Sequence, residues 1–288
     1  MSESNEFDRS EENIGNVMCM QHINLTVPDQ QLAALFYISG LGFTRDPYID
    51  FGSLLWVNAG DQQFHILPTG TAQKWRGHIG VLVPDLVDLK RRLDKIAKPL
   101  AETQFVWEEK DDHIQVTCPW GNNMRAYGPE KFPGRYLGIP YAEMQVVPGT
   151  SEGIARFYER VLATPAVVKD DGDGKRVEVS MGFSQRLIYK ETDQQIDGYD
   201  GHHIAIHIAN FSAPHDYLVE HDLVIQEDDQ HQYRFKAIVD PESGETMAEL
   251  EHEVRSLKHP MFKRDLVNRN ASQTFFNYAE GRDAFYPG

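Results

Sequence analysis

The chain repeats one pattern four times, and this repeat limits the folds open to it more than any single motif does. Four segments read as short strands that end in a turn: "MQHINLTVPD" at 20–29, "RGHIGVLVPD" at 76–85, "YAEMQVVPG" at 141–149 and "GHHIAIHIAN" at 201–210. Helical patterns follow at 30–41, 86–97, 151–162 and 213–223, with apolar residues about three and four positions apart. Further strand-like runs come after each helix. The repeating unit is therefore a strand, a helix and three strands.

The register of the copies can be fixed within the sequence. Fourteen positions separate His22 from Phe36, and fourteen separate Glu143 from Phe157, where "FYISGL" and "FYERVL" begin. The same offset identifies the matching position in the other two copies. The four aligned strand-opening residues are His22, His78, Glu143 and His203. Three histidines and a carboxylate at one repeated position are hard to explain by packing alone, so we interpret them as candidate ligands.

The composition is typical of a globular protein and excludes several partners. The 288 residues are 41% hydrophobic, which is enough to bury a core, and the net charge of -16 opposes binding to nucleic acid or anionic membranes. No apolar run approaches the roughly twenty residues of a membrane span. Cys19 and Cys118 are the only cysteines, which favours a reduced, cytoplasmic protein. The polar and acidic residues 1–16 predict a flexible tail.

At this level of detail the chain resembles the vicinal oxygen chelate superfamily, which includes glyoxalase I, bleomycin-resistance proteins and extradiol dioxygenases. The segments that carry the resemblance are "HINLTVPD", "FYISGLGF", "GHIGVLVPDL", "CPWGNNMRAYGP", "ARFYERVL", "GHHIAIHIANF" and "DPESGETMAELEHEV". The resemblance implies an α+β fold of four βαβββ modules, paired into two half-barrel domains. We expect an N-terminal domain at 17–130, a C-terminal domain at 139–260 and an extension at 261–288 that wraps over a cavity or contacts a second subunit.

In this superfamily, metal ligands project from the first and last strands of the modules. For the C-terminal pair the resemblance implies a metal site of Glu143, His203 and Glu251, with Glu249 as the alternative to Glu251. The other interpretation is that these glutamates only form ion pairs with arginines such as Arg234, and that His203 is a hydrogen-bonded strand residue.

For the N-terminal pair the resemblance implies a second metal site of His22, His65 and His78. The fourth position is Arg125, whose guanidinium cannot be a ligand, so we assign it to binding a substrate carboxylate through two hydrogen bonds. Tyr189 occupies the corresponding last-strand position of the third module and is also assigned to substrate binding.

The resemblance implies a metal-dependent enzyme that acts on a small oxygenated molecule. A divalent ion, which the sequence leaves open among Fe, Zn, Mn, Ni and Co, would bind two neighbouring substrate oxygens. His231 and Tyr233, in the polar strand "DQHQYRF", are candidate proton donors if they point inward. The alternative is a non-catalytic ligand-binding protein of the bleomycin-resistance type. Edge strands of such modules invite pairing, so a homodimer is also considered.

Overall fold

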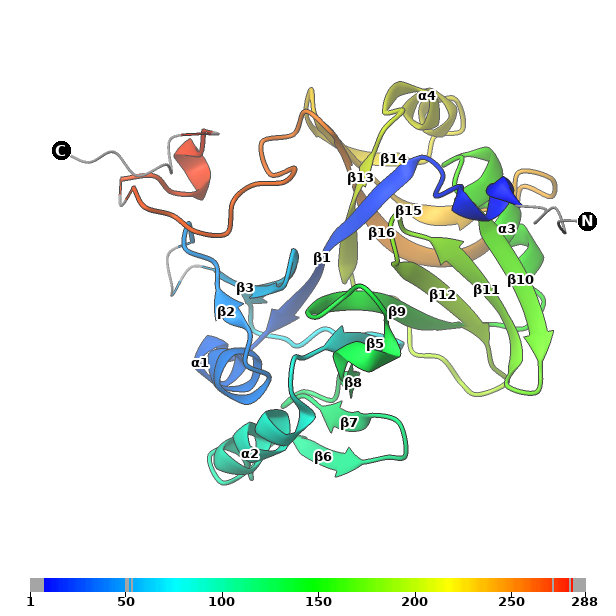
Figure 1. The fold of residues 1–288 in the computed structure, drawn as a ribbon. Helices are drawn as coiled ribbons and strands as arrows, with labels where there is room; N and C mark the ends of the chain where they lie inside the picture. The colour runs from blue at the N-terminus through cyan, green and yellow to red at the C-terminus, as the bar shows by residue number, and fades with distance from the viewer. Residues whose placement is uncertain (1–7, 50–51, 53, 271, 280, 282–288) are drawn as a thin grey trace, which may run out of the picture.

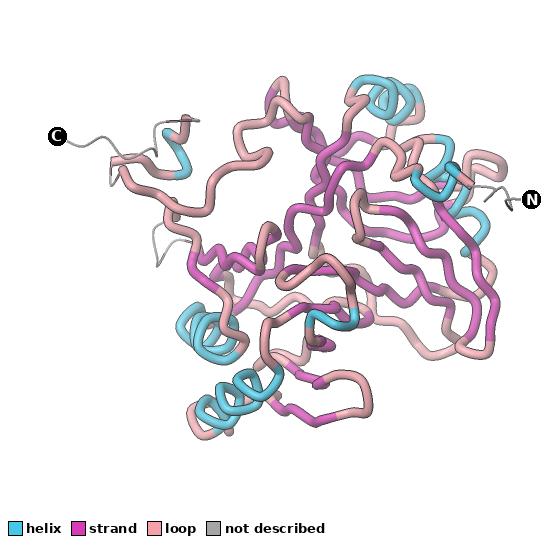
Figure 2. Tube along the Cα trace, viewed as in Figure 1, coloured by secondary structure: helices cyan, strands magenta, loops and turns pink. Residues whose placement is uncertain are grey.

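A computed structural model describes residues 8–49, 52, 54–270, 272–279 and 281. Each repeat forms the predicted unit of a strand, a helix and three strands (Figure 1). The molecule consists mainly of strands, and the few helices lie at its periphery (Figure 2). The strands form two eight-stranded sheets, which we call sheet A and sheet B. The predicted α+β class and the four-module architecture are thus confirmed.

Sheet A is built from the first and the fourth module, in the order β14-β15-β16-β13-β1-β4-β3-β2. The first module contains β1 (Val17–Val27), α1 (Gln30–Ala34), the π-helix η2 (Leu35–Gly40), β2 (Thr44–Arg45), β3 (Leu55–Ala59) and β4 (Gln62–Pro68). The fourth contains β13 (His203–Ile208), α4 (Ser212–Glu220), β14 (Val224–Asp229), β15 (Gln232–Val239) and β16 (Thr246–Ser256). The two opening strands, β1 and β13, pair antiparallel at the centre of the sheet.

Sheet B is built from the second and the third module, in the order β10-β11-β12-β9-β5-β8-β7-β6. The second module contains β5 (Gly77–Leu82), α2 (Leu86–Ala97), β6 (Val106–Glu109), β7 (Ile114–Thr117) and β8 (Asn123–Tyr127). The third contains β9 (Gly138–Val146), α3 (Ser151–Arg160), β10 (Ala166–Asp171), β11 (Gly174–Ser180) and β12 (Arg186–Glu191), after a short 3-10 turn, η3 (Pro129–Lys131). Here β5 and β9 are the central antiparallel pair.

The pairing of the modules differs from the expectation of two consecutive halves, 17–130 and 139–260. The sheets join the first module to the fourth and the second to the third. Every module offers the same kind of opening strand, so the repeat alone does not specify which copies pair. The connection at 128–137 brings β9 back beside β5, and this leaves β1 and β13 for each other. Consecutive modules still touch, since η2 packs on α2, and α3 contacts β15 and β16.

Local sequence explains the helices. The Asp85 carboxylate caps α2 by accepting hydrogen bonds from the backbone N–H groups of Val87 and Asp88, and Asp29 caps α1 in the same way. Helix α2 buries Leu89, Leu93 and Ile96, which lie on one face at helical spacing. Its bounds coincide with the predicted 86–97. No helix among the described residues is long and apolar enough to cross a membrane.

The described segments near both ends of the chain contact the modules. Residues 1–7 of the predicted tail lie outside the described residues, whereas Arg9–Glu12 forms the 3-10 turn η1 and the Asn16 N–H donates to the Ala163 carbonyl at 2.9 Å. Residues 8–16 therefore depart from the prediction of a flexible tail. The C-terminal extension, with a 3-10 turn η4 (Phe275–Asn277), wraps over the first module, where Met261 packs against Ile49 and Trp56.

Candidate metal centre and a second cavity

Sheet A brings together two histidines and a glutamate from both ends of the chain. One ligand atom each of His22 on β1, His203 on β13 and Glu253 on β16 lies within 4.8 Å of the other two. Across the sheet, Ala205 pairs with His22 on one side and with Glu253 on the other. Because the alanine side chain is small, it leaves room for the imidazole and the carboxylate to approach each other.

Hydrogen bonding orients the His22 ring as a metal ligand requires. The side-chain oxygen of Gln21 accepts from Arg255 at 2.6 Å and lies 3.0 Å from His22 Nδ1. Arginine can only donate, so this oxygen is an acceptor and His22 Nδ1 carries the proton. The lone pair is then on Nε2, which is buried and has no hydrogen-bond partner among the described residues. A metal-ligating histidine typically has this arrangement, with one nitrogen fixed by a neighbour and the other free.

The protonation states also suit a cation. His22 is 1% exposed and Glu253 is 3% exposed. Burial, together with His65 nearby, holds the pKa of His22 well below its ordinary value, which keeps the imidazole neutral. Burial opposes the charge on Glu253, but the nearby Arg255 guanidinium and His203 imidazole outweigh it and hold the pKa of Glu253 well below its ordinary value. Neutral imidazole and ionised carboxylate are the forms that bind metals.

Distances within the cluster are compatible with one shared ion. Two ligands about 2.1 Å from an ion, at tetrahedral or right angles, lie about 3 to 3.5 Å from each other. His203 Nε2 lies 3.6 Å from Glu253 Oε2, so this pair needs only a small adjustment. Two guanidinium groups already contact Glu253, because Arg234 pairs with one carboxylate oxygen and Arg255 with the other. An ion would therefore share this carboxylate with the arginines.

His65 supports the cluster from the side. Its ring stacks on His22 with centroids 3.6 Å apart, and Trp56 stacks on its other face at 3.7 Å. His65 Nε2 lies 3.0 Å from the Gln63 side-chain oxygen, and Gln63 in turn donates to the buried Asp46. The stacking restricts the His22 ring to one orientation. His22 and His65 are thus brought together as the sequence predicts, whereas His78 lies in the other sheet.

The predicted set of Glu143, His203 and Glu251 is not brought together. Glu143 lies on β9 in sheet B and pairs with His78, whose Nδ1 is 3.3 Å from its carboxylate. Glu251 accepts from Arg234 at 2.7 Å, as the ion-pair interpretation expects, and lies 3.8 Å from His203 Nδ1. Glu249 is 43% exposed in its side chain and pairs with Lys236. Glu253, which alternation along β16 places on the same face as Glu249 and Glu251, lies in the cluster where the sequence predicts Glu251.

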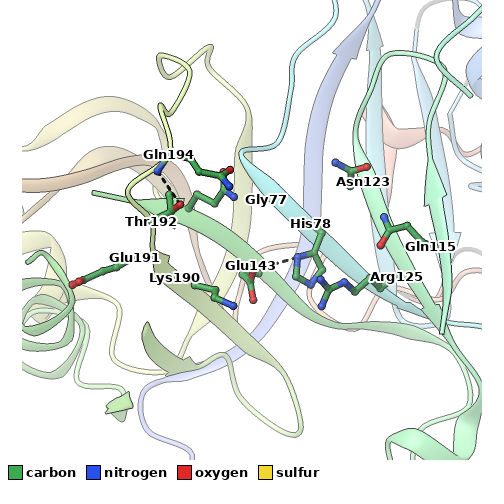
Figure 3. Close-up of a pocket in the computed structure, with 11 residues that line it drawn as sticks. Gly77, His78, Gln115, Asn123, Arg125, Glu143, Lys190, Glu191, Thr192 and Gln194 are labelled. Atoms are coloured by element: carbon green, nitrogen blue, oxygen red, sulfur yellow. Dashed lines mark hydrogen bonds and ion pairs between the residues drawn. The ribbon is translucent and has the colours of Figure 1, made fainter. Parts of the chain in front are cut away.

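Sheet B carries a cavity of about 520 Å³ at the position that corresponds to the candidate metal centre of sheet A (Figure 3). The register defines the correspondence. His65 pairs with the residue two places after His22, and Arg125 pairs with the residue two places after His78. By the same reasoning Lys190 on β12 corresponds to Glu253 on β16. Two cations thus replace a histidine and a carboxylate.

Three further predictions depended on which face of a strand a side chain occupies. Tyr189 is one residue out of register with the cavity, and its hydroxyl meets that of Tyr158 on α3 at 2.6 Å in the core. Tyr233 packs on Phe211 beside α4, on the face of β15 opposite to Arg234. His231 lies in the turn before β15. The predicted substrate contact of Tyr189 and the predicted inward orientation of Tyr233 are therefore wrong.

Comparison with known proteins identifies the fold. No protein-family model and no curated protein matches the sequence. Among solved structures, the chain is similar to a candidate dioxygenase from Bacillus subtilis, with 15% identity, coverage of 85% of this chain and 86% of that one, and a TM-score of 0.57. It is also similar to glyoxalase I from Zea mays, with 12% identity, coverage of 83% and 92%, and a TM-score of 0.60.

At these identities the likeness shows the fold. The protein has the fold of the vicinal oxygen chelate superfamily, as the sequence resemblance predicts. Within that fold, this chain carries one site with two histidines and a glutamate and one site with an arginine and a lysine.

Proposed function

We propose that the protein is a metal-dependent enzyme of the glyoxalase or dioxygenase type that acts on a small molecule with two neighbouring oxygens. His22, His203 and Glu253 would hold a divalent ion. The observation that carries this proposal is the His22 Nε2 atom, which belongs to one of the three clustered side chains and is buried without a hydrogen-bond partner among the described residues. An unpaired nitrogen in such a place is costly unless a ligand satisfies it.

The ligand types favour ferrous iron. Two imidazoles and one carboxylate are the set of non-haem iron oxygenases, and they leave neighbouring coordination positions open. When bound, such an ion would act as a Lewis acid toward the substrate oxygens. Glu251 is the candidate group to hold or move a proton, because it lies 3.8 Å from His203 Nδ1 and its side chain is 19% exposed. The burial of His22 and Glu253 would exclude water.

Metal content tests this proposal. We expect about one divalent ion per chain in protein purified without chelators, and loss of most of it in His22→Gln and His203→Gln. His78→Gln in sheet B is the matched control, since it removes the corresponding imidazole, and it is expected to leave the metal content unchanged. Glu253→Gln is a poor first test because it also leaves Arg255 without its carboxylate. Equal metal content in all variants would refute the proposal.

A second experiment tests for open coordination positions. Protein loaded with Co²⁺ is titrated with acetohydroxamate, which binds metals through two oxygens. We expect the visible spectrum of Co²⁺ to change and saturate, since three protein ligands leave room for a bidentate molecule. A spectrum that does not respond would mean that the ion is closed to substrate, and the site would then be structural.

A second candidate function is supported by a separate cavity. This cavity has a volume of about 500 Å³ and lies between the N-terminal segment and the extension. Its lining includes Met18, Phe183, Met261 and Phe262. Apolar linings of this size suit ligand binding without chemistry, as in the bleomycin-resistance type. An apolar ligand that binds equally well to metal-free protein would favour this function. A homodimer stays a prediction, and the acidic residues and bulges of the edge strand β14 oppose pairing there.

A further inference from the structure

The cavity of sheet B contains a guanidinium group that has no hydrogen-bond or ion-pair partner among the described residues. The group is the side chain of Arg125 on β8, whose charge acts on the Glu143 carboxylate without an ion pair between them. Its Nε is buried without a partner. A buried donor of this strength is expected to have an acceptor, and a planar guanidinium suits a carboxylate through two parallel hydrogen bonds.

The nearest carboxylate is already engaged. In Figure 3 the Glu143 side chain lies between Lys190 and His78. Glu143 pairs with His78 Nδ1 at 3.3 Å, and His78 Nε2 lies 3.0 Å from the Tyr141 hydroxyl. Both imidazole nitrogens therefore have partners. This differs from His22 in sheet A, and it leaves no free nitrogen for an ion.

The other groups that line the cavity suit a small polar anion. Lys190 has a side chain that is 25% exposed and an ion pair with Asp173 at 2.8 Å, so its charge is shared. Four neutral amides also line the cavity: Gln115, Asn123, Gln145 and Gln194. The Glu191 carboxylate belongs to the lining too, but it accepts from the Ser151 N–H at 3.0 Å and points away from Arg125 (Figure 3). Amides can bind hydroxyl or carbonyl oxygens of the remainder of a ligand. With one unpaired cation, the cavity matches a single carboxylate better than a phosphate dianion.

We propose that this cavity is a binding site for a small organic carboxylate, held by Arg125 and assisted by Lys190, and that it works separately from the metal cluster of sheet A. The duplicated modules would then have diverged, so that one sheet holds a cation and the other an anion. The replacement of His65 and Glu253 by Arg125 and Lys190 at matching positions accounts for the difference.

Calorimetric titration of the full chain tests the proposal. The probes are acetate, pyruvate and malonate, with neutral pyruvamide and inorganic phosphate for comparison. We expect one-site saturable binding of at least one carboxylate at millimolar concentrations or below, no binding of pyruvamide and weaker binding of phosphate. Arg125→Gln is expected to weaken carboxylate binding about tenfold or more. Arg125→Lys keeps the charge but loses the planar group that makes two parallel hydrogen bonds, so its affinity for the carboxylate should be intermediate.

Matched variants make the result specific. Arg91→Gln removes an exposed guanidinium, and His203→Gln changes the metal cluster, so both are expected to bind carboxylate as the wild type does. Thermal unfolding checks that Arg125→Gln is folded, and little loss is expected because the Arg125 side chain has no hydrogen bond or ion pair to lose among the described residues. The proposal is overturned if none of the three carboxylates binds, if binding persists in folded Arg125→Gln, or if phosphate binds as tightly.

Discussion

Replacing Asp46 with asparagine is expected to destabilise the protein strongly. The Asp46 carboxylate is fully buried and pairs with Arg264 of the C-terminal extension, whose side chain is 2% exposed. It also accepts from the Tyr48 N–H at 2.9 Å and from the Gln63 side chain at 2.6 Å. Asparagine keeps the shape and most of these contacts. It removes the charge, so the guanidinium of Arg264 is left buried and unpaired.

Breaking a buried ion pair by removing one partner costs about 3 to 5 kcal/mol. This corresponds to an increase in the unfolding constant of roughly a hundredfold to several thousandfold. For a chain of this size each kcal/mol shifts the melting temperature by about 2 °C, so we expect a decrease of about 6 to 10 °C. The same pair joins the extension to the Gln63 and His65 side chains beside the candidate metal centre.

Urea unfolding followed by tryptophan fluorescence measures this effect. Asp46→Asn with Arg264→Met removes both charges and is expected to recover most of the lost stability, because the desolvated guanidinium is gone. Asp88→Asn is the control for an exposed ion pair and should change stability by less than about 1 kcal/mol. A loss below about 1 kcal/mol in Asp46→Asn would show that Arg264 finds solvent, and the reasoning from burial would be wrong.

Three other perturbations test the surroundings of the two sites. Glu253→Gln is expected to lower the unfolding free energy by about 3 to 5 kcal/mol in metal-free protein, because Arg255 is left buried without its carboxylate; a neutral result in urea unfolding would contradict this. Gly80→Ala places a Cβ 2.3 Å from the Tyr141 ring and should reduce the melting temperature through a loss of about 1 to 3 kcal/mol. Burial lowers the pKa of His252 to about 4, so below its ordinary 6.5 the unfolded chain binds a proton that the native protein does not. His252 therefore contributes a loss of stability of about 1.4 kcal/mol for each unit by which the pH is lowered between 6.5 and 4, and urea unfolding of His252→Gln should lack this one-proton contribution.

The sequence predicts the modules well because their signals are local. Helix α2 follows from its capping aspartate and its apolar spacing, and the fourfold register follows from matching segments within the chain. The pairing of modules depends on contacts between distant segments. All four opening strands have similar sequences, so the sequence does not show which two of them pair with each other. For this reason the sequence predicts His22 and His203 in two different metal sites, although the structure brings them together.

The prediction of Glu251, with Glu249 as the alternative, differs from the structure for a related reason. Alternation puts Glu249, Glu251 and Glu253 on one face. Which of them lies near His22 depends on the register of β16 against β13 and of β13 against β1. Ala205 pairs with both His22 and Glu253, and neither pairing is visible from sequence spacing. The same holds for the link between Asp46 and Arg264, which are far apart in the chain. The assignment of Tyr189 to substrate binding is wrong by one residue: Lys190 lines the cavity, and a shift of one residue along a strand reverses the face.

The most direct measurement is the position of a bound ion in crystals of the protein grown with Co²⁺. An anomalous difference map at the cobalt absorption edge would locate it. We expect the strongest peak to lie among His22 Nε2, the His203 imidazole and the Glu253 carboxylate. A strongest peak beside His78 and Glu143, or crystals of Co²⁺-treated protein without a peak at the cluster of sheet A, would contradict a metal centre formed by the first and fourth modules.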